Sequence, residues 1–230
     1  GRLASHIKSM SNMRSIKIFS VILFSFLLAN CSSTDPTLQI MNLDTAKKLV
    51  RHYYESGDFD KESEKIIDDA IRTIDKMELN NSSVVVFDVD ETALSNYKIT
   101  KETGFGFIPK LWDEWQLKGI AEALPQTKRF YDYLISKNIH IIFLTGRANF
   151  VLESTRSNLI EKGFVKFDTL IVRGTNESKT PAAEFKSRKR EELVKDGYDI
   201  IACIGDQWSD LTGGNTGYKI KLPNYLYILD

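Results

Sequence analysis

Four short, largely apolar runs constrain the fold more than any other feature of the chain. They occupy residues 84–87, 139–144, 169–172 and 200–204. Each run is too short for a helix and rich in β-branched residues, which is typical of a strand covered on both faces of a parallel sheet. Helical segments follow the first three runs, at residues 126–136, 150–161 and 182–195. This alternation predicts a doubly wound α/β fold, and right-handed crossovers place the carboxyl ends of all four strands along one edge of the sheet.

Two further helices and an insert complete the predicted organisation. Apolar residues spaced by three and four predict packing helices at 44–55 and 61–79, within an N-terminal helical segment 43–80. Residues 96–124 form an insert after the first strand. Its aromatic residues are Tyr97, Phe105, Phe107, Trp112 and Trp115. We expect them to form the insert's own small core, with stacking on an aromatic leaving group as the alternative. We also expect Trp208 to be a packing residue.

The first 42 residues have the pattern of an export signal followed by a tether. Met10 or Met13 is the expected natural start, Arg14 and Lys17 form a positive head, and residues 18–29 are an apolar run too short to cross a bilayer. We therefore predict a leader and signal peptide over 1–31 and a tether over 32–42.

The end of the apolar run resembles the lipobox of bacterial lipoproteins, in which the cysteine is lipidated. Here that cysteine is Cys31, preceded by Leu-Ala-Asn. The resemblance implies a lipid anchor in a membrane, and ordinary secretion with cleavage nearby is the alternative. Lipidation of Cys31 leaves only Cys203, so no internal disulfide is expected.

The charge balance argues against one class of partner. The 31 basic residues equal the 31 acidic residues, so the formal net charge is zero. Because nucleic-acid binding rests on a basic surface, no nucleic-acid polymer is expected as a partner.

Polar residues follow three of the four predicted strands. Asp88 and Asp90 follow the first, Thr145 and Gly146 the second, and the segment with Asp206 and Asp210 the fourth. Like charges about 4 Å apart repel by several kcal/mol at an effective dielectric near 20, so four carboxylates that gather at one edge imply a divalent cation. Each motif alone is weak, since Asp-x-Asp also occurs in metal-dependent glycosyl transfer and Asp residues four apart often lie on a solvated helix face.

Together these motifs resemble those of the haloacid dehalogenase-like superfamily. The matching stretches are VVVFDVDET, FLTGR, a lysine in a helix, and GDQWSD. The flanking stretches DETALSNY, DEWQLKGIAEALPQT, FKSRKREELVKDGY and IGDQWSDL resemble the class B acid phosphatases of its subfamily IIIB, which include plant acid phosphatases related to vegetative storage proteins and bacterial surface lipoprotein phosphatases. The similarity runs from about Asp44 to Tyr227 and implies a phosphatase domain over 81–230 with a cap at 96–124.

The resemblance also implies roles for the motif carboxylates. Asp88 is the expected nucleophile, which forms an aspartyl-phosphate. Asp90 is the expected general acid and base, a role that suits acidic solution or requires a raised pKa. Asp88, the main-chain carbonyl of Asp90, and Asp206 are the expected ligands of Mg²⁺, and Asp210 is expected to orient a metal-bound water or a lysine.

The phosphate-binding residues implied by the family are Thr145, Gly146 and a lysine. Lys179, Lys186 and Lys189 all lie between the third and fourth strands, and the stretch FKSRKREEL favours Lys186.

The resulting hypothesis is an exported, Mg²⁺-dependent acid phosphatase that takes a small phosphomonoester. A nucleotidase, a phosphotransferase, and a storage or binding relative are the alternatives. The expected location is the periplasm or outer membrane of a bacterium, or the medium, and the sequence leaves the oligomeric state open.

Overall fold

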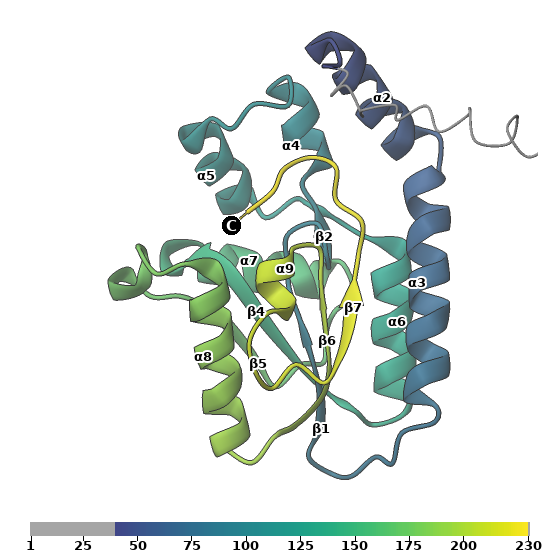
Figure 1. The fold of residues 1–230 in the computed structure, drawn as a ribbon. Helices are drawn as coiled ribbons and strands as arrows, with labels where there is room; N and C mark the ends of the chain where they lie inside the picture. Colours follow the sequence, from purple (N-terminus) through teal and green to yellow (C-terminus); the bar gives the residue numbers. More distant parts are fainter. Residues whose placement is uncertain (1–39, 230) are drawn as a thin grey trace, which may run out of the picture. The chain divides into compact units, whose positions relative to one another are not determined.

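A five-stranded parallel sheet forms the middle layer of the fold (Figure 1). The structure is a computed structural model and describes residues 40–229. The strands are β1 Ser83–Phe87, β4 His140–Ala148, β5 Thr169–Arg173, β6 Asp199–Gly205 and β7 Tyr218–Lys221. Their order across the sheet is β5-β4-β1-β6-β7. The doubly wound α/β prediction is confirmed. Of the five strands in this sheet, the sequence did not predict β7, a short edge strand whose Tyr-Lys-Ile-Lys sequence lacks an apolar run.

Alternate residues of the strands enter two separate cores, because side chains of a strand point to opposite faces of the sheet. Val85 and Phe87 of β1 pack in the larger core, with apolar residues of α3 Asp58–Ile74, α6 Pro125–Ser136 and α7 Leu152–Glu161. Val84 and Val86 pack in the smaller core, with α8 Ala182–Lys195 and α9 Trp208–Leu211. Helices therefore cover both faces, which explains why the central strands have no polar alternation.

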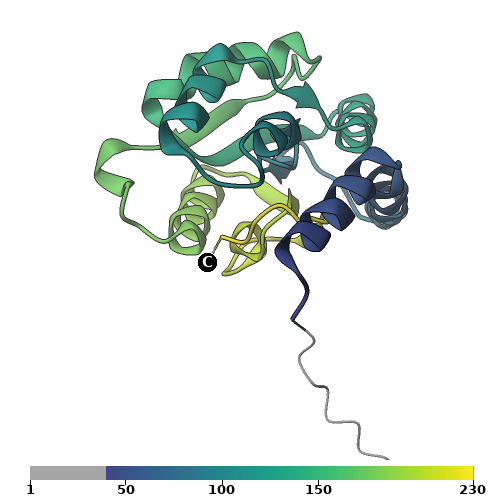
Figure 2. The ribbon, with the colours of Figure 1, turned by 90° about the horizontal axis from the view of Figure 1, so that it is seen from above.

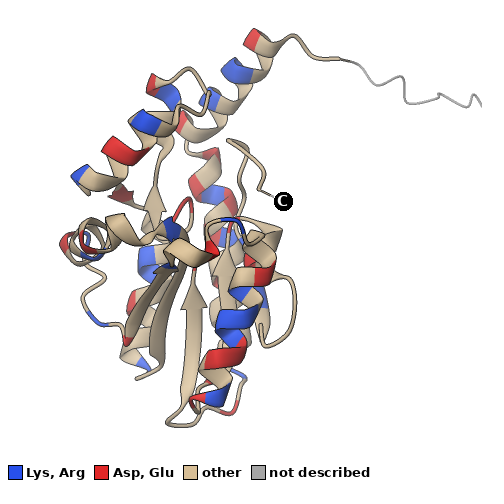
Figure 3. Cartoon of the chain, turned by 90° about the vertical axis from the view of Figure 1, so that its left-hand side faces the viewer, with Lys and Arg blue, Asp and Glu red and all other residues tan. Residues whose placement is uncertain are grey.

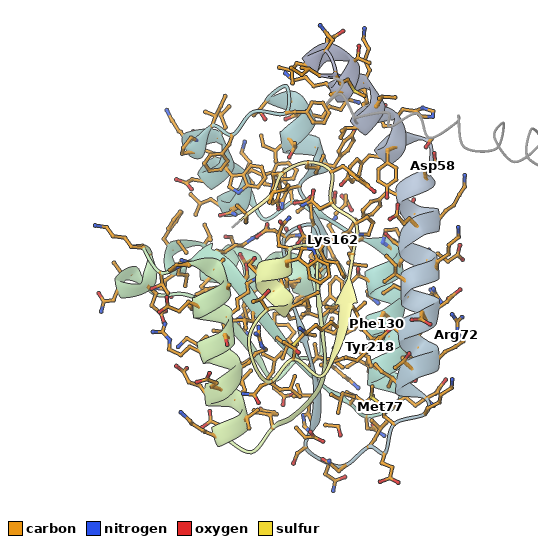
Figure 4. All side chains as sticks on the ribbon, viewed as in Figure 1. Asp58, Arg72, Met77, Phe130, Lys162 and Tyr218 are labelled. Carbon is orange, nitrogen blue, oxygen red and sulfur yellow. The ribbon has the colours of Figure 1, made fainter. Side chains whose placement is uncertain are left out.

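Most charged side chains of the helices lie on the outside, and Lys186 and Arg190 of α8 are buried exceptions. Figure 3 shows most acidic and basic residues on the helices, while the strands are largely free of them. On the helix pair α3 and α6, Arg72 lies on the outer side of α3, whereas Phe130 of α6 is fully buried against the sheet (Figure 4).

The two N-terminal helices differ from the sequence prediction in extent and in packing. The first, α2 Leu43–Glu55, has no fully buried residue and its Leu49 is 52% exposed, so the prediction of a packing helix was only partly right. Its contacts come from the last turn, where Tyr54 stacks on Phe59 and on Tyr97. The second, α3, ends at Ile74 rather than at residue 79.

The insert is closed by a small antiparallel ribbon of β2 Leu94–Ser95 and β3 Glu122–Ala123. Between these strands lie α4 Tyr97–Glu102 and α5 Pro109–Lys118. Of the five aromatic residues of the insert only Trp115 is buried and Phe107 is 70% exposed, so the prediction of a self-contained aromatic core was only partly right. Trp208 is 65% exposed and has Lys221 above its ring, so the prediction that it is a packing residue was wrong.

The segment after β7 returns over the carboxyl edge of the sheet. Figure 1 shows it rising beside α4 toward α5, and the view from above in Figure 2 shows it on the same edge. The predicted export signal and Cys31 lie outside the described residues, as does most of the predicted tether. Within residues 40–229, no helix has the length and apolar character that a membrane span requires.

Candidate active site

Asp88 lies at the carboxyl end of β1 and forms an ion pair with a lysine from another element. Its main-chain N–H donates to the carbonyl of Ile204 in β6, which extends the β1–β6 pairing by one residue. The carboxylate is 7% exposed. Nζ of Lys186, on α8, lies 2.5 Å from Oδ1 of Asp88 and 2.5 Å from Oδ1 of Asp210. The lysine therefore joins the ends of β1 and α9.

Three buried carboxylates lie close to one another at this site, and two of them contact the lysine. One oxygen of each of Asp88, Asp206 and Asp210 lies within 4.8 Å of the others. Within residues 40–229, these three carboxylates form the group that could hold a metal ion. Three ionised carboxylates and one ammonium group sum to −2. A divalent cation would balance this charge, and an all-oxygen donor set suits a hard ion of the Mg²⁺ type. The residues present therefore fit a divalent metal.

The pKa values of two of these carboxyls show the excess of negative charge. Burial raises the pKa of Asp88 well above its usual range; Lys186 opposes this shift, and Asp210 and Asp206 reinforce it. Burial and the neighbouring Asp210 raise the pKa of Asp206 to about 6. A bound cation would favour the ionised form of both groups.

Asp206 is held from three directions. Its Oδ1 accepts a hydrogen bond from the Thr92 hydroxyl at 3.1 Å. Its Oδ2 accepts from the side-chain amides of Gln207 and Asn224, both at 2.6 Å. The segment after β7 supplies Asn224, a residue that the sequence analysis did not identify, because nothing in its local sequence distinguishes it from any loop asparagine.

Asp90 does not belong to this group of three carboxylates and pairs with Arg147 instead. Both of its oxygens accept hydrogen bonds from the Arg147 guanidinium at 2.8–3.1 Å, and Oδ1 also accepts from Nδ2 of Asn96 at 2.7 Å. Four carboxylates were predicted to converge, and the structure brings together three. Burial opposes ionisation of Asp90, but the charge and hydrogen bonds of Arg147, with the bond from Asn96, outweigh it and lower the pKa. Because the pKa of Asp90 is lowered, the acid role suits acidic solution.

Thr145 and Gly146 lie inside β4 rather than after it. Pairing between β4 and β5 is irregular between Leu144 and Ala148, so these residues leave the regular register while the strand continues. Thr145 is fully buried, and its hydroxyl accepts a hydrogen bond from the main-chain N–H of Arg147 at 3.1 Å. Arg147, quoted in the motif but given no role from the sequence, is the partner of Asp90.

The structure distinguishes Lys186 from the other lysines considered. Lys186 is 5% exposed and contacts Asp88, whereas Lys189 pairs with Glu177 and Glu192 near the surface. On the same helix, Arg190 is fully buried and donates to the carbonyls of three residues at and after the end of α9. Those carbonyls belong to Asp210, Thr212 and Gly214.

Comparison with known proteins gives the same family as the motifs. The family described as HAD superfamily, subfamily IIIB (Acid phosphatase) matches residues 25–229. The "Stem 28 kDa glycoprotein" of Glycine max is 37% identical over 188 residues, which cover 79% of this chain and 74% of that protein. "Acid phosphatase 1" of Solanum lycopersicum is 32% identical over 186 residues, 78% of this chain and 73% of that one. The solved class C acid phosphatase of Bacillus anthracis superposes with a TM-score of 0.67 at 26% identity, covering 80% of this chain and 86% of that chain.

The fold and the carboxylate site therefore define a HAD-superfamily hydrolase. The chain belongs to subfamily IIIB of that superfamily, the acid phosphatases, and is a phosphomonoesterase that acts on small phosphate esters. The superfamily generally uses a divalent metal, in agreement with the three-carboxylate group.

Proposed function

We propose that this acid phosphatase hydrolyses phosphomonoesters through an aspartyl-phosphate on Asp88. The observation that supports it best is the position of Lys186, which is buried and bridges Asp88 and Asp210. An ammonium group beside the attacking carboxylate neutralises the charge of an incoming phosphoryl group, whose three oxygens would otherwise be repelled by three carboxylates. A surface lysine could not supply this effect, because water would screen it.

The proposed reaction has two displacements. In the first, an oxygen of Asp88 forms a bond to phosphorus while the bond from phosphorus to the ester oxygen breaks, and Asp90 donates a proton to the departing oxygen. In the second, Asp90 takes a proton from water, the resulting hydroxide attacks phosphorus, and Asp88 is released with inorganic phosphate. Both residues return to their starting state.

The remaining residues bind the phosphate and the metal. Thr145 and Gly146 are the proposed donors to the phosphate oxygens, together with Lys186. Mg²⁺ is the proposed ion, with the carboxylates of Asp88 and Asp206 and the main-chain carbonyl of Asp90 as ligands. When bound, it supplies positive charge that stabilises the negatively charged transition state. Asp210 is the proposed partner that holds Lys186 in place.

Phosphate release by the full chain tests this function. With an aryl phosphate and Mg²⁺ we expect turnover, loss of turnover with a chelator, and recovery when Mg²⁺ is restored. Asp88→Asn should abolish turnover at an unchanged circular dichroism spectrum, while Asp196→Asn, a surface control at the end of α8, should not. Acid quenching with labelled substrate should trap a hydroxylamine-sensitive phosphoprotein in the unaltered chain and in Asp196→Asn, and none in Asp88→Asn. Turnover that survives in Asp88→Asn would mean another nucleophile.

We also infer that the chain is exported and lipidated at Cys31. The support is the basic head, apolar run and lipobox-like cysteine, together with two plant relatives that are named glycoproteins, a modification typical of secreted chains. Labelling with a fatty acid during expression in a bacterium should mark the chain and not Cys31→Ser. An unlabelled chain that is found in the periplasm or medium would instead indicate ordinary secretion.

A further inference from the structure

A buried network of hydrogen bonds connects the insert to Asp90. Asn96, which precedes α4, is fully buried. Its Nδ2 donates to Oδ1 of Asp90 at 2.7 Å and to Oε2 of Glu91 at 2.9 Å. Its Oδ1 accepts a hydrogen bond from the indole Nε1 of Trp115 at 2.8 Å. One asparagine thus uses both ends of its amide, one toward the catalytic loop and one toward α5.

The chemistry of these partners permits only one orientation of the amide. The indole N–H of Trp115 is a donor only, and an ionised carboxylate such as Asp90 is an acceptor only. If the Asn96 amide turned by 180°, its oxygen would face the carboxylates and its NH₂ group would face the indole N–H. The Asn96 carbonyl oxygen, its NH₂ group and the Trp115 indole N–H would then lack partners, each at a cost of about 1–3 kcal/mol, while Asp90 and Glu91 would keep their bonds from Arg147 and Tyr227. Trp115 therefore fixes the direction in which Asn96 donates.

The loop that carries Asp90 is held against the same asparagine. Glu91 adopts a positive φ of 50°, and its Oε1 accepts a hydrogen bond from the main-chain N–H of Asn96 at 2.6 Å. The Tyr227 hydroxyl donates to Oε2 of Glu91 at 3.0 Å. The turn from Asp90 to Asn96 is thus closed on itself by its own side chains, which limits how far the Asp90 backbone is able to move.

The insert is anchored at its other end, so Trp115 has a fixed position. Trp115 is 6% exposed and belongs to the main core. At the end of the insert, Ala121 exchanges two hydrogen bonds with the Asn158 side chain of α7, its N–H donating at 3.0 Å and its carbonyl accepting at 2.8 Å. The indole is thus held by the folded body of the protein.

We propose that Asn96 and Trp115 are positioning residues for proton transfer by Asp90. Arg147 binds the Asp90 carboxylate from one side, and Asn96 binds Oδ1 from another, so the two together fix the direction of the carboxyl plane. Trp115 acts through Asn96 and does not touch the substrate. The proposal deepens the proposed function and rests on the role given there to Asp90. Its consequence is that the insert takes part in proton transfer through these two residues.

The dependence of rate on the leaving group tests this role. An acid matters for a poor leaving group such as the phenolate of phenyl phosphate and little for 2,4-dinitrophenolate, which departs without a proton. Trp115→Phe removes the indole N–H and keeps an aromatic ring, and we expect kcat/KM for phenyl phosphate to fall about tenfold, against less than about twofold for 2,4-dinitrophenyl phosphate. Asn96→Ala should widen the difference to about 100-fold, because the acid itself contributes about 10²- to 10⁴-fold.

Matched variants separate this proposal from its foundation. Trp112→Phe is the control on the same helix, since its indole lies edge-on to the Tyr227 ring, and it should change neither substrate. Asp90→Asn should lose phenyl phosphate activity selectively. If it does not, the acid role of Asp90 fails and the proposed function with it. If Asp90→Asn is selective but folded Trp115→Phe and Asn96→Ala lower both substrates equally, or neither, the positioning role alone is refuted.

Discussion

Removal of the buried lysine charge should destabilise the protein strongly and in a pH-dependent way. Lys186→Met keeps an unbranched side chain of similar length and removes the ammonium group that contacts Asp88 and Asp210 at 2.5 Å. At that distance and an effective dielectric near 20, each carboxylate is attracted by about 7 kcal/mol. The several kcal/mol needed to bury each ion offset much of this attraction. Breaking a buried pair by removing one partner costs about 3–5 kcal/mol, and we expect a loss in that range near neutral pH.

The loss should shrink in acid. Burial already raises the pKa of Asp88, and Lys186 opposes that shift, so removing the lysine raises this pKa further. A carboxyl with a raised pKa in the folded state keeps a proton that the unfolded state releases. Its destabilising effect therefore grows as the pH rises above about 4, the ordinary pKa of an aspartate in the unfolded chain. The difference in the free energy of unfolding between Lys186→Met and the unaltered chain should therefore be smaller near pH 5 than near pH 8.

Urea unfolding followed by tryptophan fluorescence, with a chelator present, measures the loss of stability and its dependence on pH. Lys189→Met is the matched control on the same helix, because this lysine pairs with Glu177 and Glu192 near the surface, and it should cost less than about 1 kcal/mol. A loss below about 1 kcal/mol for Lys186→Met, or a loss of equal size at both pH values, would show that the ammonium group does not stabilise the buried carboxylates.

Two other substitutions test the packing around the site. A Cβ at Gly205 would lie 2.3 Å from Oδ2 and 2.4 Å from Cβ of Asp210, so Gly205→Ala should destabilise the fold by about 1–3 kcal/mol in thermal unfolding. At Gly214 a Cβ would meet no atom within 4 Å, so Gly214→Ala should change the stability by less than about 0.5 kcal/mol. Equal effects of the two substitutions would contradict the close approach at Gly205. Burial raises the pKa of the Cys203 thiol to about 12. Near pH 8 this thiol should therefore resist alkylation in the folded Cys31→Ser chain and react fully in denaturant. Alkylation of the folded chain at the rate of a free thiol would contradict the burial of Cys203.

Local sequence was sufficient to identify the central strands and the residues at their ends. β1 and β6 could be identified because a strand covered on both faces has a nearly continuous apolar run, and Asp88 and Asp206 could be identified because they directly follow such runs. By contrast, the edge strand β7 and the exposure of Trp208 were not predicted. Neither local hydrophobicity nor residue type shows which side of an element faces solvent.

The partners of the site residues could not be predicted in the same way, because they come from distant parts of the chain. Asn224 reaches Asp206 from the segment after β7, and Trp115 reaches Asn96 across the insert. Arg147 belongs to a recognised motif, but its guanidinium reaches Asp90 only because β4 pairs with β1 in the sheet. A local pattern carries no information on such pairings.

The α/β class, the family, and the carboxylates and lysines available for chemistry could all be identified from the sequence, since each of these follows from residue types at fixed local spacings. The packing of distant segments brings Asp88, Asp206 and Asp210 together, pairs Lys186 with Asp88 and Asp210, and pairs Asp90 with Arg147. The physical reason is that electrostatic and hydrogen-bond energies depend on distances through space, and these are set by the packing of α8, β4 and the insert around the sheet edge.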